Sequence, residues 1–272
     1  MNLNTLEHPA LSELLSIMKQ LRDPETGCPW DLEQDFASIV PHTLEEAYEV
    51  AEAIEQGDWQ NLKSELGDLL FQVVFYAQLA KEADWFDFEQ VMHTLNEKLV
   101  RRHPHVFAES KAGTHAELKV QWQAIKEQER ASQGKQPETL FSAIPIALPA
   151  LTRADKIQKK VSTLGFDWPE VSGALEKVKE EVLEVEDELA ADPFSDKTAE
   201  EIGDLLFAVV NVARHCKRDP EQLLRQANLK FSQRFEKVER YLLEQGLAIE
   251  QASLEQMDSA WEQVKRQEVT KT

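Results

Sequence analysis

Apolar residues recur along the chain at the spacing of an α-helix, and this pattern predicts an all-α fold. The most continuous apolar stretches, residues 66–80 and 205–213, are too short to span a bilayer, so we interpret them as buried core helices. We find no run of β-branched residues between turn signals that would favour a strand. Near the N-terminus, five residues share one helical face: Leu11, Leu14, Leu15, Met18 and Leu21.

Four sequence blocks occur twice in the same order, which predicts a tandem repeat. The longest, Glu65-Leu-Gly-Asp-Leu-Leu-Phe-Gln-Val-Val74, matches Glu201-Ile-Gly-Asp-Leu-Leu-Phe-Ala-Val-Val210. In each copy it follows a Glu-Glu-x-x-Glu block and precedes Asn-x-Lys-x-x-x-Arg and Trp-x-x-x-Lys-x-Gln-Glu blocks. We therefore expect two helical-bundle domains, at residues 1–131 and 151–272, joined by a proline-containing linker at 132–150.

The two Glu-Glu-x-x-Glu blocks place carboxylates beside an apolar helical stripe. In the second copy this stripe is made of Val178, Val182, Val185 and Leu189, and Glu181 and Glu184 follow its edge. On the next helix, Glu201 and Asp204 share a different face from four residues expected to point inward: Ile202, Leu205, Leu206 and Val209. If the two helices pack antiparallel, the four carboxylates converge. In the first copy, Thr43 and Glu46 predict a capping box at a helix start, and Gly57 predicts the helix end.

Converging carboxylates are costly unless a cation neutralises them, and oxygen ligands without His or Cys select hard ions. We expect Mg²⁺, with Mn²⁺ as a substitute. Because Mg²⁺ favours few carboxylates together with substrate phosphates, the expected substrate carries a polyphosphate. Lys230 and Arg234 share one helical face, near Asn228, and can grip phosphate oxygens. Trp261 and Lys265 can stack a base and hold a phosphate.

Each of these features also has a plain structural interpretation. Glutamate often only solvates a helix, Lys177 and Glu181 form an ordinary helical pair, and Trp261 can be a core residue. Likewise, Lys230 and Arg234 can pair with the nearby Glu236 or Glu239 at the surface. Repetition favours the functional interpretation: the second copy keeps Glu-Glu-x-x-Glu without a Ser or Thr that would make Glu181 a capping residue.

The overall charge limits the partners. The 272 residues include 50 acidic and 30 basic ones, a net charge of −20, which disfavours binding to a nucleic acid polymer. A small phosphorylated ligand remains compatible, because bound cations invert the local field. Cys28 and Cys216 lack zinc or disulfide spacing, and the N-terminus lacks an export signal. We expect a cytoplasmic protein without a membrane partner.

The repeated blocks, with Gly27-Cys-Pro-Trp-Asp31, Arg101-Arg-His-Pro-His-Val-Phe107 and Lys156-Ile-Gln-Lys159, resemble the MazG nucleotide pyrophosphohydrolases over essentially the whole chain. The resemblance implies an all-α dimer that uses magnesium. Its implied reaction is hydrolysis of ribo- and deoxyribonucleoside triphosphates, with broad base tolerance, between the α and β phosphates to a monophosphate and pyrophosphate. The implied metal ligands are Glu181, Glu184, Glu201 and Asp204, with Glu180 or Glu181 accepting a proton from water. Implied nucleotide contacts are Lys177, Lys197, Glu200, Asp204, Asn211, Asn228, Lys230, Arg234, Trp261 and Lys265.

The two copies differ on the second acidic helix. Ala208, Asn211 and His215 continue the acidic face in the second copy, whereas the first copy has Gln72, Phe75 and Leu79 there. We therefore hypothesise that the second copy carries most activity and that the first is structural or regulatory. The equivalent N-terminal cluster comprises Glu45, Glu46, Glu49, Glu65, Asp68, Lys98, Arg102, Trp122 and Lys126.

Three alternatives remain open at the level of sequence. A narrower all-α pyrophosphatase, specific for dUTP or phosphoribosyl-ATP, would have the same acidic cluster. A nucleotide-sensing module would bind nucleotide with magnesium but not turn it over, and a helical scaffold would show no magnesium effect on nucleotide affinity. A regulatory protein partner is compatible with each of them.

Overall fold

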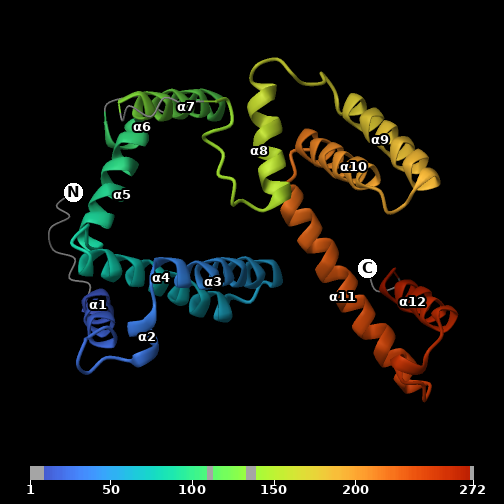
Figure 1. Ribbon diagram of the computed structural model, residues 1–272, viewed down its shortest axis with the longest axis horizontal. Helices are drawn as coiled ribbons and strands as arrows, with labels where there is room; N and C mark the ends of the chain where they lie inside the picture. The colour runs from blue at the N-terminus through green and yellow to red at the C-terminus, as the bar shows by residue number, and fades with distance from the viewer. Residues whose placement is uncertain (1–8, 109–112, 133–138, 270–272) are drawn as a thin grey trace. The chain divides into compact units, whose positions relative to one another are not determined.

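The computed structural model describes residues 9–108, 113–132 and 139–269, and every regular element in these ranges is a helix. This confirms the all-α prediction. The chain separates into two compact units, one ending at Lys135 and the other beginning at Gln136 (Figure 1). The boundary lies inside the proposed linker 132–150, of which residues 133–138 are outside the described ranges.

The first unit is organised around a helical hairpin. Its α3 and α4 lie side by side, and α1 and α5 contact α4 (Figure 1). Met18 of α1, Ile39 of α3 and Val74, Phe75 and Leu79 of α4 form its buried core. The helices are α1 (Pro9–Leu21), α2 (Pro29–Glu33), α3 (Phe36–Gln56), α4 (Trp59–Glu82), α5 (Phe88–Arg102), α6 (Pro104–Phe107) and α7 (His115–Ser132).

The second unit contains a similar hairpin, formed by α9 and α10, and a second helix pair, formed by α11 and α12. Helix α8 contacts both α10 and α11. Val238, Leu242, Ala260 and Val264 form the core between α11 and α12. The elements are α8 (Ala150–Ser162), α9 (Val171–Ala191), α10 (Asp196–His215), α11 (Pro220–Glu244), the 3₁₀ helix η1 (Ile249–Gln251) and α12 (Leu254–Val269).

The start of α3 differs from the expectation. The helix begins at Phe36, where Asp35 and Ser38 form a reciprocal capping box, so the capping box predicted at Thr43 is wrong. The Thr43 hydroxyl instead lies inside the helix, 3.1 Å from the Ile39 carbonyl and 3.0 Å from the Tyr76 hydroxyl. The predicted end is confirmed: Gly57 follows α3 with a φ of 71°, a conformation that glycine adopts without strain.

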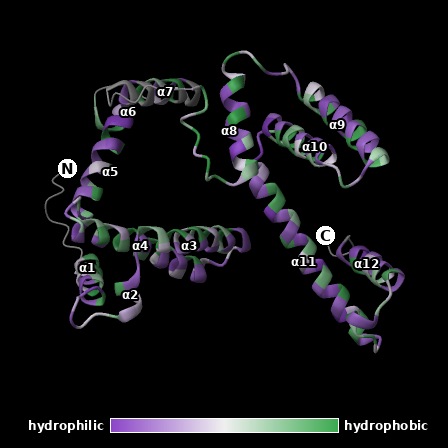
Figure 2. Cartoon of the chain, in the orientation of Figure 1, coloured by the Kyte–Doolittle hydropathy of each residue, from purple (hydrophilic) through white to green (hydrophobic). Residues whose placement is uncertain are grey.

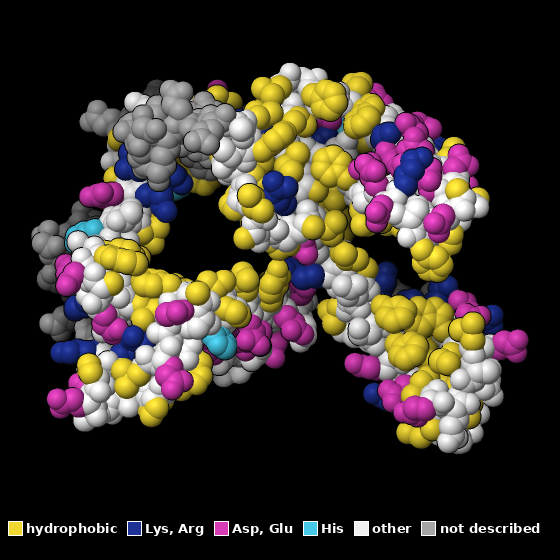
Figure 3. Space-filling model, in the orientation of Figure 1, with side chains coloured by type: hydrophobic (Ala, Val, Ile, Leu, Met, Phe, Trp, Pro, Cys, Tyr) yellow, Lys and Arg dark blue, Asp and Glu magenta, His cyan; other side chains and the backbone are white. Residues whose placement is uncertain are grey.

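The apolar faces of both hairpins are partly open. Residues expected to point inward in the second unit are more than one-third exposed, which corrects that expectation: Val182, Leu189, Ile202, Leu206 and Val209. Figure 2 shows hydrophobic positions along α9 and α10, and Figure 3 shows hydrophobic side chains at the surface over the α3–α4 pair. The reason is that α9 and α10 pack mainly on each other, while α8 covers α10.

Among the described residues, no helix has both the length and the apolar character that crossing a bilayer requires.

Candidate active site

The α9–α10 hairpin is closed by hydrogen bonds at its turn. Ser195 caps α10 by accepting a 3.0 Å hydrogen bond from the Thr198 backbone N–H. The buried Thr198 hydroxyl donates to the Asp192 carbonyl at 2.7 Å, which ties α10 to the residue that ends α9. These contacts satisfy backbone groups left without helical partners. They set the register in which the carboxylates of α9 face those of α10.

Three of the four carboxylates predicted to bind metal come together. Glu181 and Glu184 of α9 and Glu201 of α10 each offer an oxygen within 4.8 Å of the others. Glu181 is only 4% exposed, and its Oε2 has no hydrogen-bond partner among the described residues. Burial and the neighbouring Glu181 charge raise the pKa of Glu184. A buried carboxylate oxygen without a partner, beside two further carboxylates, fits a bound cation.

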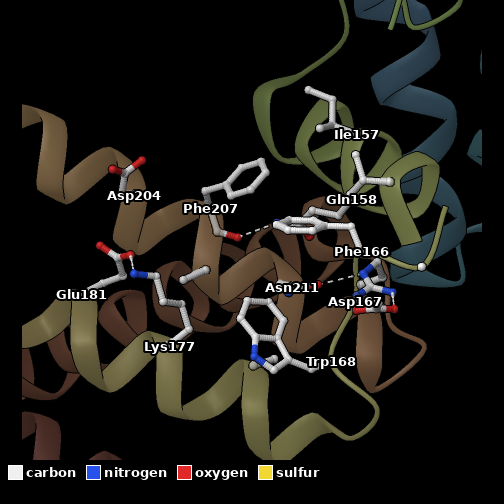
Figure 4. Close-up of a pocket in the computed structure, with 15 residues that line it drawn as sticks. Ile157, Gln158, Phe166, Asp167, Trp168, Lys177, Glu181, Asp204, Phe207 and Asn211 are labelled. Carbon is white, nitrogen blue, oxygen red and sulfur yellow. Dashed lines mark hydrogen bonds and ion pairs between the residues drawn. The ribbon is translucent and has the colours of Figure 1, made fainter. Parts of the chain in front are cut away.

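Asp204, the fourth predicted ligand, lies outside this group of three but lines the same cavity as Glu181 (Figure 4). Lys177 connects the first two glutamates of the Glu-Glu-x-x-Glu block, because its Nζ lies 2.8 Å from Oε1 of both Glu180 and Glu181. Those two carboxylates raise the pKa of Lys177 above its usual range. The ammonium therefore partly neutralises the cluster from the α9 side.

The other polar residues predicted on α10 have separate positions. Lys197 forms an ion pair with Glu188 of α9, which raises the pKa of the lysine. Glu200 is exposed and is not among the described residues that line the cavity. Asn211 is buried, lines the cavity, and accepts a 2.8 Å hydrogen bond from Nε of Arg214.

A cavity of about 740 Å³ extends from the carboxylates toward the loop between α8 and α9. Glu181, Asp204 and Lys177 line one end, and Trp168 and Asn211 line the other (Figure 4). The loop is fixed by Asp167, whose Oδ2 accepts from Nη1 of Arg214 at 3.0 Å and whose Oδ1 lies 3.1 Å from the His215 ring. Arg214, followed by His215, holds the pKa of Asp167 below its usual value.

The sequence did not assign cavity-lining roles to Gln158, Asp167, Trp168 and Arg214. One sequence signal for the role of Trp168 was available: the loop Gly165-Phe-Asp-Trp168 loosely repeats Gly27-Cys-Pro-Trp30 of the first copy. Gly173 gives a second one: a Cβ there would lie 2.3 Å from Cδ1 of Trp168, so only glycine lets the indole pack on the first turn of α9.

The cations predicted to bind phosphate lie on the α11–α12 pair. Arg234 pairs with Glu268 at 2.8 Å and lies over the Trp261 ring at 5.1 Å, so its partner is Glu268 of α12 rather than Glu236 or Glu239, which the plain structural interpretation offered. Trp261 packs against the core of the pair. Asn228 and Lys230 are exposed on α11, and Lys265 pairs with Glu262 at 3.1 Å. The cavity is lined from α8 to α10, so these residues do not reach it within one chain.

The first unit gathers its equivalent carboxylates. Glu46, Glu49 and Glu65 offer oxygens within 4.8 Å of one another. Burial, then the Asp68 and Glu65 charges, raise the pKa of Glu46, and a hydrogen bond with Glu65 is the main cause that raises the pKa of Glu49. Glu45 is exposed, with His42 at 3.8 Å.

The remaining N-terminal positions parallel those on α11 and α12. Arg102 pairs with Glu129 at 2.6 Å, and the Trp122 ring lies 5.6 Å from that of His103. Lys98 is half-buried on α5, and the side chain of Lys126 lies outside the described residues.

Comparisons with known proteins identify a family that the chain resembles in sequence. A family model described as the MazG nucleotide pyrophosphohydrolase domain matches residues 34–107, which include α3 to α6. The chain is 50% identical over 260 residues to the nucleoside triphosphate pyrophosphohydrolase of Escherichia coli strain K12, covering 95% of this chain and 98% of that protein. It is 45% identical over 253 residues to the nucleoside triphosphate pyrophosphohydrolase/pyrophosphatase MazG of Thermotoga maritima, covering 93% and 94%. The crystal structure of a mazG-related protein from Thermotoga maritima is 30% identical, with a TM-score of 0.37, and the match covers 43% of this chain and 98% of that chain.

Proposed function

The chain belongs to the MazG family of nucleoside triphosphate pyrophosphohydrolases, and from that membership we propose that its second unit carries a magnesium-dependent active site. Its reaction is the hydrolysis of nucleoside triphosphates between the α and β phosphates to a monophosphate and pyrophosphate, with broad base tolerance. The observation that carries the choice of site is the buried Oε2 of Glu181, which has no hydrogen-bond partner among the described residues and lies beside Glu184 and Glu201.

Glu181, Glu184 and Glu201 would hold the cation, with Asp204 adding a ligand from the cavity wall. When bound there, Mg²⁺, or Mn²⁺ in its place, neutralises triphosphate charge and acidifies a water molecule. Oxygen-only donors suit these hard ions. The open side of the cavity leaves room for the phosphates beside the carboxylates.

Side chains of α9 would then accept the proton of the attacking water and stabilise the charge on the leaving group. The exposed Glu180 carboxylate accepts the proton of the attacking water. Lys177, now shared between Glu180 and Glu181, can donate to a phosphate oxygen once a cation takes over the neutralisation of Glu181. Charge-assisted donation of this kind stabilises the pyrophosphate leaving group.

We further propose that the protein is a homodimer in the cytoplasm. Both hairpins expose apolar residues that a second copy would cover, including Leu44 and Leu66 in the first unit and Leu183 and Leu206 in the second. The exposed Lys230 and its neighbours on α11 would be available to nucleotide bound by a partner. Both cysteines are free thiols, which suits a reducing compartment.

The test is pyrophosphate release from the eight common ribo- and deoxyribonucleoside triphosphates, with and without Mg²⁺. We expect metal-dependent release from the wild-type protein, because the carboxylates need a cation to bind the triphosphate. Glu201→Gln should reduce it by at least about 100-fold, since it removes one charged ligand from the cluster. Glu65→Gln, the matched change in the first unit, should leave it close to wild type.

Full activity of Glu201→Gln would contradict a site in the second unit. Release that is lost only in Glu65→Gln would assign the activity to the first unit. Release from one nucleotide alone would support a narrower pyrophosphatase, and magnesium-dependent binding without release would support a nucleotide-sensing module.

A further inference from the structure

The end of the cavity away from the carboxylates contains a buried hydrogen-bond acceptor that is already oriented. Gln158 of α8 is only 4% exposed and lines the cavity. Its Nε2 donates to the Phe207 carbonyl at 2.8 Å, which determines which way the amide faces. Its Oε1 is buried and has no hydrogen-bond partner among the described residues. A buried acceptor without a partner is costly, so it indicates a donor supplied by a ligand.

The surroundings of this acceptor suit a flat aromatic ring. Trp168 and Phe207 line the same cavity. Trp168 can pack against α9 because Gly173 has no side chain there. Asn211 adds a second polar group: its Oδ1 accepts from Arg214, so its amide nitrogen is the atom that it can offer as a donor. Aromatic walls with a few fixed polar groups are typical of nucleobase sites.

The first unit fills the corresponding space with hydrocarbon. Ile17-Met18-Lys19 of α1 corresponds to Ile157-Gln158-Lys159 of α8, and Phe75 corresponds to Asn211 by the repeated block. Met18 is 1% exposed and Phe75 is 0% exposed, and both belong to the same core cluster. Gln158 and Asn211, which are polar and line the cavity, thus correspond to two apolar core residues of the other repeat.

We propose that Gln158 is a specificity-determining residue that reads the nucleobase, with its Oε1 accepting an N–H from the base edge. This inference rests on the proposed function of the second unit, since the triphosphate would lie at the Glu181 end of the same cavity. Each common base carries an N–H donor next to an acceptor on its pairing edge, so the Gln158 acceptor and the Asn211 donor match all of them. The pair admits every common base and rejects a ring without an N–H.

The test compares two nucleotides that differ only in whether the base carries an N–H donor. Adenosine 5′-monophosphate carries the 6-amino group, and purine riboside 5′-monophosphate has hydrogen in its place. Isothermal titration calorimetry on the full chain with Mg²⁺ gives both dissociation constants. In the wild type we expect adenosine monophosphate to bind about tenfold more tightly, the effect of one net hydrogen bond. The ratio of kcat/KM for the two triphosphates should show the same preference.

Gln158→Met, which introduces the residue found at the matching position of the first unit, should reduce the ratio of dissociation constants to about one. Gln72→Met is the matched control, because it removes a buried glutamine of the first unit and should keep the tenfold preference. Equal affinities in the wild type, or an unchanged preference in a folded Gln158→Met protein, would overturn the proposal. Neither result depends on pyrophosphate release, so loss of turnover, which concerns the proposed function, remains a separate outcome.

Discussion

Glu129 in the first unit and Glu268 in the second each bind two basic side chains from a neighbouring helix. Glu129 accepts from Arg101 and Arg102, and Glu268 accepts from Arg234 and Lys237. Both glutamates end the repeated Trp-x-x-x-Lys-x-Gln-Glu block. The last residue of that block is therefore explained by an ion pair between two helices, which the sequence could not show because the partners lie far apart along the chain.

Replacing Glu129 with glutamine should destabilise the first unit in a pH-dependent way. Its arginine partners, Arg102 first, lower its pKa from 4.5 to about 2 in the folded state. A lowered folded-state pKa adds stability above the unfolded-state pKa, and that stability is lost as the pH falls toward 2. After allowance for solvent screening, we expect a loss of about 1 kcal/mol in the free energy of unfolding at pH 7.

Urea unfolding followed by circular dichroism at pH 7, 5 and 3 measures this effect. The difference between wild type and Glu129→Gln should be constant above pH 5 and should shrink at pH 3. Glu97→Gln, at an exposed position of α5, is the control and should differ little from wild type. A difference that grows as the pH falls would contradict the sign of the argument.

The candidate site was predictable from sequence only where local spacing decides the geometry. Glu181, Glu184 and Glu201 come together because helical periodicity and antiparallel packing place them there. The role inferred for Gln158 depends on the Phe207 carbonyl, a backbone atom of another helix. No residue type or spacing near Gln158 predicts this hydrogen bond. The position of Arg234 is likewise set by the packing of α11 on α12, through Glu268 and Trp261, rather than by its spacing from Lys230.

At the scale of the element, the α9–α10 hairpin depends on its turn. Thr198 is 1% exposed and its hydroxyl links the start of α10 to the end of α9. Thr198→Val removes this donor with almost no change of volume and leaves the Asp192 carbonyl without it. We expect a loss of about 1–2 kcal/mol in the free energy of unfolding, measured by urea titration.

The same variant should lower pyrophosphate release at limiting Mg²⁺ more than at saturating Mg²⁺, because a looser turn spreads the carboxylates that hold the ion. Ser232→Ala, at an exposed site on α11, is the control and should affect neither quantity. Thr198→Val with wild-type stability would show that the cap of Ser195 alone closes the turn.

The composition of a capping box was not sufficient to predict where α3 begins. The Thr43–Glu46 pattern has the composition of a capping box, but the chain is already helical from Phe36, where Asp35 and Ser38 supply the caps. A Ser or Thr followed by Glu occurs inside helices as well, because its hydroxyl can bond to the carbonyl of the preceding turn. Glycine with positive φ is a stricter signal, and Gly57 ends α3 as expected.

At the scale of the whole molecule, the open apolar faces predict self-association. Leu183 and Leu206 are 60% and 55% exposed on the α9–α10 hairpin. Replacing both with glutamate should shift the protein from dimer to monomer in sedimentation velocity at micromolar concentration, because the charges would have to be buried on association. Glu186→Gln, at a polar position of α9, should remain dimeric. A wild-type protein that sediments as a monomer would refute the prediction.

The two units should also differ in melting temperature, because the core of the first is packed and the second contains a cavity. Met18 and Phe75 are fully packed in the core of the first unit, whereas the cavity of the second unit leaves its lining without such neighbours. Scanning calorimetry should therefore show two endotherms, with the second unit melting at the lower temperature. A bound nucleotide should move only that lower endotherm upward, because ligand stabilises only the part of the chain that holds it.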